Sequence, residues 1–264
     1  MAFRDLCFVL SGMTKIFLPL KIIKDPEAMD IEYNPDPFFQ KVVEKATLKQ
    51  HVYNNTLETF NLIKDSILEL EKKYADYVKN KVPHVLVPFE SSSMSDFEIE
   101  LKFGGDVLLF LMHTNIFEFS RHHEVMRTDY IHEDKSRSYC GVINIYNFLA
   151  DSFKYNRVND IGYLIGRVFV NKDKHYFIEG KRELGFIFNN FENNLVDQAS
   201  INNLLETAIT YTVNFDLLTP DYDLVKEVSV YDMKNTRDII SIKTGKRLGY
   251  KFQADTERSN GGGA

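Results

Sequence analysis

Four of the seven histidines lie close together in the chain, and acidic residues accompany them. The set consists of His113, His122, His123, His132, Glu124, Glu133 and Asp134. Imidazole and carboxylate groups together suit zinc, iron or manganese. The spacing contains no HExxH pattern, and the adjacent His122 and His123 point apart on any regular structure. We weigh a metal site formed in a loop against a solvated polar loop, prefer the second, and assign no metal ligand.

A carboxylate and a lysine two positions apart, Glu100 and Lys102, form a second candidate. Nucleases of the PD-(D/E)xK kind carry such a pair on a strand, with a further acid upstream, and their carboxylates hold Mg²⁺. Here Glu90 or Asp96 would have to be that acid, and Asp96 is too close in sequence. The pair also fits the polar face of an alternating strand, which explains both residues without catalysis.

A short basic motif occurs twice, as Gly180-Lys181-Arg182 and as Gly245-Lys246-Arg247. Glycine allows a ligand to approach the backbone, and a Lys-Arg pair can grip a phosphate or carboxylate. We therefore predict an anionic ligand, a nucleotide or a nucleic acid at these residues. The simpler interpretation is two hairpin turns with solvated charges. The predicted ligand-binding residues are Lys181, Arg182, Lys246 and Arg247.

The elements that would position these residues begin with a long helix over residues 38–81, and the polar stretch 51–56 is where it could break. Its second half places six apolar or aromatic residues at alternating spacings of three and four, on one face of the helix. They are Phe60, Ile63, Ile67, Leu70, Tyr74 and Tyr77. This face either packs on the core of the chain or forms a homodimer; fewer than four heptads are present.

The clearest hairpin follows, because Phe97, Ile99, Leu101 and Phe103 alternate with charged residues and a glycine pair then precedes an apolar run. Gly104-Gly105-Asp106 resembles the signature of diguanylate cyclases, but Val107 stands where a second acid is expected. We interpret the motif as a tight turn.

The rest of the chain alternates between predicted strands and helices. We expect a polar loop over 120–138 and strands over 162–170, 175–179, 184–188, 228–231 and 239–242. A helix is predicted from the helical spacing of Val142, Tyr146, Leu149 and Phe153, and another over 197–213. Cys140 is expected to be a small core residue.

This order predicts an α+β fold, an antiparallel sheet built from hairpins and meanders with helices packed on it. It resembles, in topology alone, small sensory folds of the GAF or PAS kind. We expect one domain over residues 1–253, made of an N-terminal hairpin and connector (1–37), the helix (38–81) and a sheet-rich part (84–253). Residues 254–264 are expected to be a flexible tail.

Composition narrows the class of protein. The 264 residues are 44% hydrophobic, enough to build a core, and the net charge of −6 does not favour nucleic-acid binding over the whole surface. Two cysteines, Cys7 and Cys140, form no CxxC pair and so no thiolate zinc site. The apolar stretch 5–23 is interrupted by Ser11, Gly12 and Lys15, so we expect no targeting segment and a soluble, cytoplasmic protein.

No catalytic constellation stands out, and no cofactor motif is present. We therefore expect a non-enzymatic binding or sensing module, a homodimer through the 60–77 face, that recognises an anionic ligand, a nucleic acid or a partner protein. The alternatives are a metal-dependent phosphodiesterase or nuclease and a structural subunit of a larger assembly.

Overall fold

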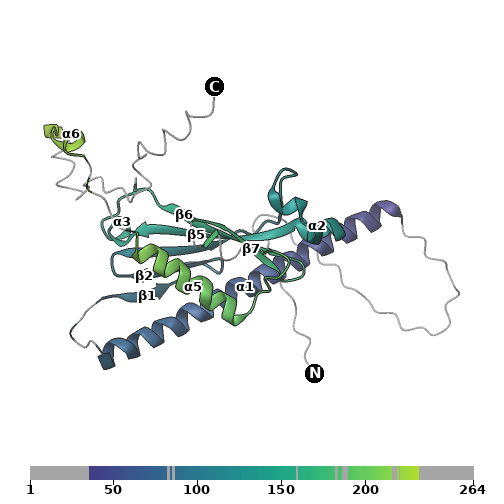
Figure 1. Cartoon of the computed structure of the whole chain (residues 1–264), viewed down its shortest axis with the longest axis horizontal. Coiled ribbons are helices and arrows are strands. Elements are labelled where there is room, and N and C mark those ends of the chain that lie inside the picture. The colour runs from purple at the N-terminus through teal and green to yellow at the C-terminus, as the bar shows by residue number, and fades with distance from the viewer. Residues whose placement is uncertain are drawn as a thin grey trace. The chain divides into compact units, whose positions relative to one another are not determined.

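The computed structural model describes residues 36–81, 84, 87–158, 160–181, 184–185, 190–215, 219 and 221–231. Within these residues, an antiparallel sheet of seven strands with helices packed against it forms the body of the structure (Figure 1). The predicted α+β fold is confirmed. The chain divides into two units, Met1–Gln40 and Lys41–Ala264. The first helix begins at the end of the first unit, and all later elements belong to the second. One domain over 1–253 stays a prediction.

Helix α1 spans Pro37–Lys81 without a break, which confirms the predicted long helix. Its buried residues recur every three or four positions, as a core-facing helix requires; they are Val52, Thr56, Thr59, Phe60, Ile63, Ser66 and Ile67. The polar members of this face are satisfied inside the helix. Thr56 Oγ1 donates to Val52 O at 2.7 Å and Ser66 Oγ to Leu62 O at 2.7 Å. They can therefore be buried without an unpaired hydroxyl.

The six residues proposed for a dimer face do not behave as one set. Phe60, Ile63 and Ile67 are each 0% exposed and pack into the core of a single chain. Leu70 and Tyr74 are half-buried, and Tyr77 is 58% exposed. A partner can therefore reach only the last part of this face. The oligomeric state itself stays a prediction.

The sheet is a meander in which every pair of neighbours is antiparallel, in the order β1-β2-β3-β5-β6-β7, with β4 also paired to β5. The strands are β1 Phe89–Ser92, β2 Glu98–Phe103, β3 Asp106–Met112, β4 Phe117–Glu118, β5 Tyr139–Leu149, β6 Tyr163–Asn171 and β7 Tyr176–Gly180. The predicted β2–β3 hairpin is confirmed, and Gly104 takes a φ of +56° in its turn. Glycine adopts this left-handed conformation without strain.

The helix predicted from Val142, Tyr146, Leu149 and Phe153 is wrong for its first three residues, which lie in β5. This strand is the centre of the sheet and pairs with β3, β4 and β6. Cys140 to Ile143 are all buried, because both faces of the sheet are covered there. A strand buried on both faces loses its simple alternation, so the helical spacing was accidental. Only Phe153 is helical, in α3 Ala150–Lys154.

Two smaller predictions also differ from the structure. Residues 228–231 form no strand, and their predicted partner 239–242 lies outside the described residues. Leu184 and Gly185 form a helical turn in place of the start of a strand, and 186–188 are not described. The predicted N-terminal strands and the tail 254–264 also lie outside the described residues. The short helix α6 Tyr222–Val225 was not predicted.

One face of the sheet is covered by α1 and by α5, Gln198–Val213 (Figure 1). The predicted helix 197–213 is confirmed, and Asp197 begins it as an N-cap that accepts from Ser200 N at 2.7 Å. Ile201, Leu204, Leu205 and Ala208 pack into the same core as Phe60 of α1. Gln198 Nε2 donates to Ser66 Oγ at 2.7 Å and so joins the two helices.

At Gly141 helix α1 packs closely against the sheet. A Cβ on this residue would lie 2.0 Å from Thr56 Oγ1 and 2.7 Å from Thr56 Cβ. These distances are far below van der Waals contact, so the helix can cross β5 here only because residue 141 has no side chain.

The opposite face of the sheet is partly covered by the segment predicted as a loop, 120–138. It forms three short helices, η1 Glu124–Arg127, α2 Asp129–Glu133 and η2 Lys135–Ser138. Val125, Tyr130 and Ile131 of this segment make a second core with residues of the sheet; those are Cys140, Val142, Phe169 and Phe177. Cys140 is 1% exposed, as predicted for a core residue, and burial raises the pKa of its thiol. None of the helices in the described residues is long and apolar enough to cross a membrane.

An ion pair ties this segment to the turn after β6. Lys172 Nζ lies 2.5 Å from Asp134 Oδ2, and Ser136 donates to Asp134 Oδ1 from its backbone N and from Oγ. The hydrogen bond from Lys172, followed by those from Ser136, holds the pKa of the Asp134 carboxyl well below its usual range. A folded-state pKa below the unfolded value stabilises the protein above the ordinary aspartate pKa, and that contribution is lost as the pH falls through the folded-state value.

We therefore expect Asp134→Asn to lower the free energy of unfolding at pH 7 by about 1 kcal/mol, since the pair is partly solvent-screened. The difference from the original protein should shrink at about pH 3, where the unfolded-state aspartate is protonated. Urea unfolding at both pH values measures it. Asp129→Asn, on the exposed side of α2, is the control and should change little. Equal losses at the two pH values would contradict the assignment.

Candidate functional site

Of the four predicted ligand-binding residues the structure describes one. Lys181 directly follows β7 and is exposed, and its backbone N donates to Ile165 O at 3.0 Å. Arg182, Lys246 and Arg247 lie outside the described residues. Whether the two basic motifs meet is therefore not tested, and the anionic ligand stays a prediction.

The four histidines are dispersed over residues 113–132, and two of them accept hydrogen bonds from nearby backbone groups. His113 Nδ1 accepts from Asn115 N at 3.0 Å, and His123 Nδ1 accepts from Val125 N at 3.3 Å as the N-cap of η1. His122 and His132 are exposed. Among the residues that the structure describes, no group of three or more histidine, cysteine, aspartate or glutamate side chains could hold a metal ion.

Glu100 and Lys102 lie on the face of β2 that points away from the helices, in register with Ser92 and Glu90 of β1. Glu90 is therefore on a neighbouring strand, diagonal to Glu100 and opposite Lys102. Burial, and then the charge of Glu98, raise the pKa of the Glu100 carboxyl. These residues alternate with the buried Ile99, Leu101 and Phe103, as the polar face of an alternating strand does.

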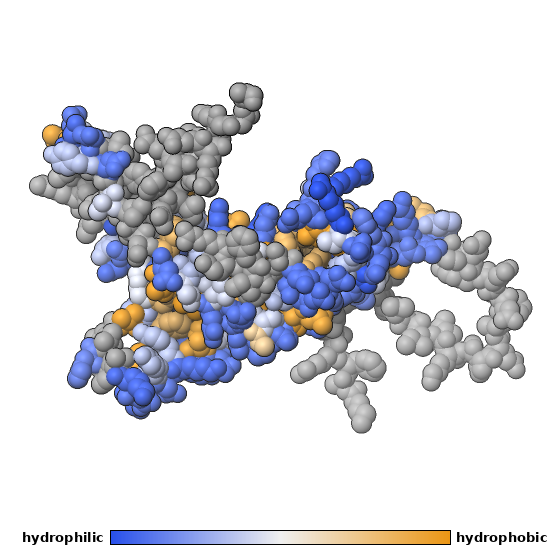
Figure 2. All heavy atoms as spheres, in the orientation of Figure 1, coloured by the Kyte–Doolittle hydropathy of each residue, from blue (hydrophilic) through white to orange (hydrophobic). Residues whose placement is uncertain are grey.

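An apolar groove lies towards the C-terminal end of α1, on the face of the sheet that the helices cover. We call it the α1–α5 groove. Its volume is about 410 Å³, and it is lined by Tyr74, Val87, Phe89, Phe103, Ile209 and Val213 together with the β2–β3 turn. Tyr74 stacks on Phe89 with ring centroids 4.7 Å apart and donates its hydroxyl to Val87 O at 3.1 Å. Figure 2 shows apolar residues at the surface between α5 and β1.

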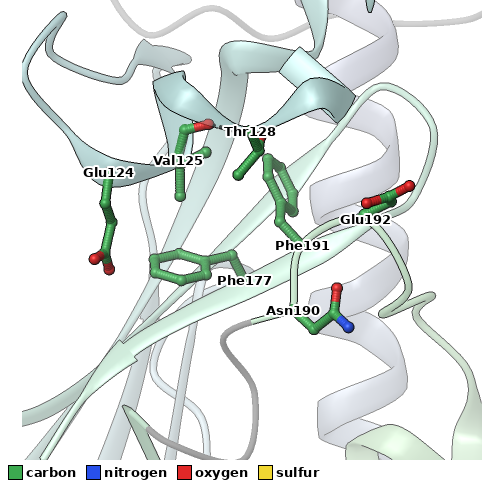
Figure 3. A pocket seen from close by; sticks show the side chains of 7 residues that line it. All are labelled: Glu124, Val125, Thr128, Phe177, Asn190, Phe191 and Glu192. Atoms are coloured by element: carbon green, nitrogen blue, oxygen red, sulfur yellow. Dashed lines mark hydrogen bonds between the residues drawn. The ribbon is translucent and has the colours of Figure 1, made fainter. Parts of the chain in front are cut away.

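A second pocket lies on the opposite face of the sheet, where η1, β7 and residues 190–192 meet (Figure 3). We call it the Phe177–Phe191 pocket. Its volume is also about 410 Å³, and it is lined by Glu124, Val125, Thr128, Phe177, Asn190, Phe191 and Glu192. Sequence reasoning missed it, because its parts are far apart in the chain and no local pattern links them. The two phenylalanines come from β7 and from residues 190–192, and the two glutamates come from η1 and from residues 190–192.

Comparison with known proteins found no similarity: no family model, no curated protein and no solved structure matches the chain. The class of protein rests on the fold alone, an α+β protein with an antiparallel meander and helices packed on it. Function therefore has to be argued from the two concave sites.

Proposed function

We propose that this protein is a non-enzymatic binding module that pairs with a second copy of itself through the α1–α5 groove. The observation that carries the proposal is the apolar lining of the groove. Asp106, the first residue of β3, is the charged residue among the described residues that line it. Concave apolar surfaces of this kind are typical of binding sites.

Exposed apolar side chains extend the groove into a larger surface. Tyr77 is 58% exposed, Val213 is 59% exposed and Val87 is 43% exposed. Removing apolar area from water contributes about 25 cal/mol per Å² before the cost of association is subtracted, so these side chains favour association. Patches of this sort on a folded domain mark interaction surfaces.

A second copy of the chain suits the groove because α1 carries both a residue that lines the groove and an exposed residue that can enter the groove of a partner. Tyr74 lines the groove, and Tyr77 stands one turn further along the same helix. In a two-fold symmetric pair, Tyr77 of each copy would reach the groove of the other, since such interfaces use the same patch twice. Tyrosine is favoured at interfaces because its ring supplies apolar contact area while its hydroxyl can still form a hydrogen bond.

We expect the protein to be a dimer in solution and Tyr77→Asp to weaken it at least about tenfold, because the change places a charge in an apolar contact. Val213→Asp, at the far side of the groove, should do the same. Both residues are more than half exposed, so the thermal unfolding of the monomer should change little. Light scattering over a range of concentrations measures the dimer.

The control is Val43→Asp, a 62% exposed valine near the start of α1 and distant in sequence from the groove. It should leave the dimer intact. A protein that is monomeric at high concentration, or a dimer broken by Val43→Asp and not by Tyr77→Asp, would sink the proposal. Elemental analysis of the purified protein tests the metal-dependent alternative, which predicts stoichiometric metal.

A further inference from the structure

The sheet carries a patch of apolar side chains that belongs to neither core. Along β3 and β5 these side chains alternate with residues that face α1 and α5, so they lie on the opposite face of the sheet. The patch, which we call the open sheet face, consists of Leu109, Leu111, Tyr146, Phe148 and Leu164. The register makes them neighbours, because Leu109 pairs with Tyr146 and Tyr146 pairs with Leu164. Leu111 and Leu164 are each 36% exposed, and the other three are half-buried.

The chemistry of this patch is unusual for a sheet face in contact with water. An antiparallel sheet that leaves one face in solvent normally carries polar side chains there. Here three neighbouring strands, β3, β5 and β6, present leucine and aromatic side chains instead. Apolar sheet faces are buried against a further layer of structure, so the open sheet face marks a place where another segment packs.

Two carboxylates on β2 border the patch. Glu98 and Glu100 pair with residues of the open sheet face in β3. Neither side chain forms a hydrogen bond or an ion pair with another residue that the structure describes. Burial, and then the charge of Glu98, raise the pKa of the Glu100 carboxyl, and Lys102 only partly offsets this. A further cation beside Glu100 would stabilise its charged form, so a basic segment suits this surface.

The chain itself contains a segment of this chemistry, residues 239–252, with the sequence IISIKTGKRLGYKF. It has no acidic residue and four basic ones, which are Lys243, Lys246, Arg247 and Lys251. Its large apolar residues are Ile239, Ile240, Ile242, Leu248, Tyr250 and Phe252. The segment therefore combines apolar side chains for the patch with positive charge for its acidic border.

This segment has an advantage over a separate partner because it is tethered to the sheet. The chain between Tyr231, the last described residue, and Ile239 can span about 27 Å when extended. A short flexible tether gives an effective concentration on the order of millimolar. A modest contact within one chain therefore outcompetes the same contact from a second copy at lower protein concentrations.

We propose that residues 239–252 dock on the open sheet face of their own chain, with their apolar side chains on the patch and Lys246 and Arg247 beside Glu98 and Glu100. The contact completes a second layer on the sheet. It is separate from the proposed dimer, since the open sheet face and the α1–α5 groove lie on opposite faces of the sheet.

The test places a nitroxide spin label on Ile242→Cys in the full chain, together with Cys7→Ser. Cys140 is 1% exposed and so stays unlabelled. The label broadens the NMR signals of nearby nuclei. The backbone amide signals of Leu111 and Tyr146 should lose at least about half of their intensity, whereas those of α5, a layer behind the sheet, should lose much less.

Charge reversal tests the pairing. Glu98→Lys with Glu100→Lys should weaken docking about tenfold and restore most of the lost intensity, because two partly exposed ion pairs are removed. Lys246→Glu with Arg247→Glu should do the same, and combining all four changes should bring the broadening back. Glu206→Lys, at an exposed glutamate of α5, is the matched control and should leave the broadening unchanged.

A mixture of two preparations identifies whose segment docks: isotope-labelled chain without the spin label, and spin-labelled chain of natural isotopic composition. Broadening of Leu111 in this mixture would mean that a second copy supplies the segment. Equal broadening of both faces, or of neither, would mean that the segment packs elsewhere, and each of these results would overturn the proposal. Recovery in the fourfold variant excludes misfolding as the cause of the loss, because an unfolded chain could not regain the contact.

Discussion

Replacing Gly141 with alanine is expected to lower the free energy of unfolding by about 3 kcal/mol, although the change adds a single methyl group. That methyl would lie 2.0 Å from Thr56 Oγ1 and 2.7 Å from both Thr56 Cβ and Cγ2. Thr56 cannot move aside alone, because its Cβ is fixed to the helix backbone and its hydroxyl is bonded to Val52 O. The whole of α1 must therefore shift from β5 and loosen the core beneath it.

Urea unfolding of Gly141→Ala measures the loss. The control is Gly105→Ala in the β2–β3 turn, where an added Cβ would meet nothing within 4 Å, and its effect should stay within about 0.5 kcal/mol. Combining Gly141→Ala with Thr56→Gly removes the three closest atoms, so the double variant should lose less than the two single losses added together. Strict additivity would show that α1 does not cross β5 at this point.

The second large effect is expected from Ile67→Asp, which should unfold the protein and not merely separate two copies of it. Ile67 is 0% exposed inside one chain, between the helix and the sheet. The substitution loses the buried side chain and places a carboxylate without a partner in the core, which together cost more than about 5 kcal/mol. This is comparable with the whole stability of a typical domain.

The neighbouring residue supplies the control. Leu68 is 47% exposed, so Leu68→Asp should leave the fold intact. Circular dichroism and light scattering on the two variants separate the possibilities. A folded monomer from Ile67→Asp would mean that the 60–67 face is an interface between copies; an unfolded chain would mean that it is the core of one.

Several elements could be predicted from the sequence because their signals are local. The period of α1, the Asp197 cap of α5 and the alternation that ends at Gly104 in the β2–β3 hairpin each depend on residues a few positions apart. Together they were enough for the α+β class. The same signals identified which face of α1 is apolar, but not what covers that face.

The partner of that face and the identity of β5 were decided by tertiary structure. Phe60, Ile63 and Ile67 meet strands and a helix that are distant in sequence, so periodicity alone allowed a dimer as readily as a core. β5 lies between two covered faces, and burial on both sides removed the alternation by which a strand is recognised.

The candidate sites depend on tertiary structure most of all. Glu124, Phe177 and Glu192 come from three segments and form no motif in the chain, while the motifs that the sequence does offer, such as the histidine stretch, are kept apart by the fold. The sequence by itself determined the helices, the hairpin and the class of fold, since short-range periodicity and turn chemistry specify them. Only the packing of distant segments could bring η1, β7 and residues 190–192 together around one pocket, because no local pattern records which residues a long chain will make neighbours.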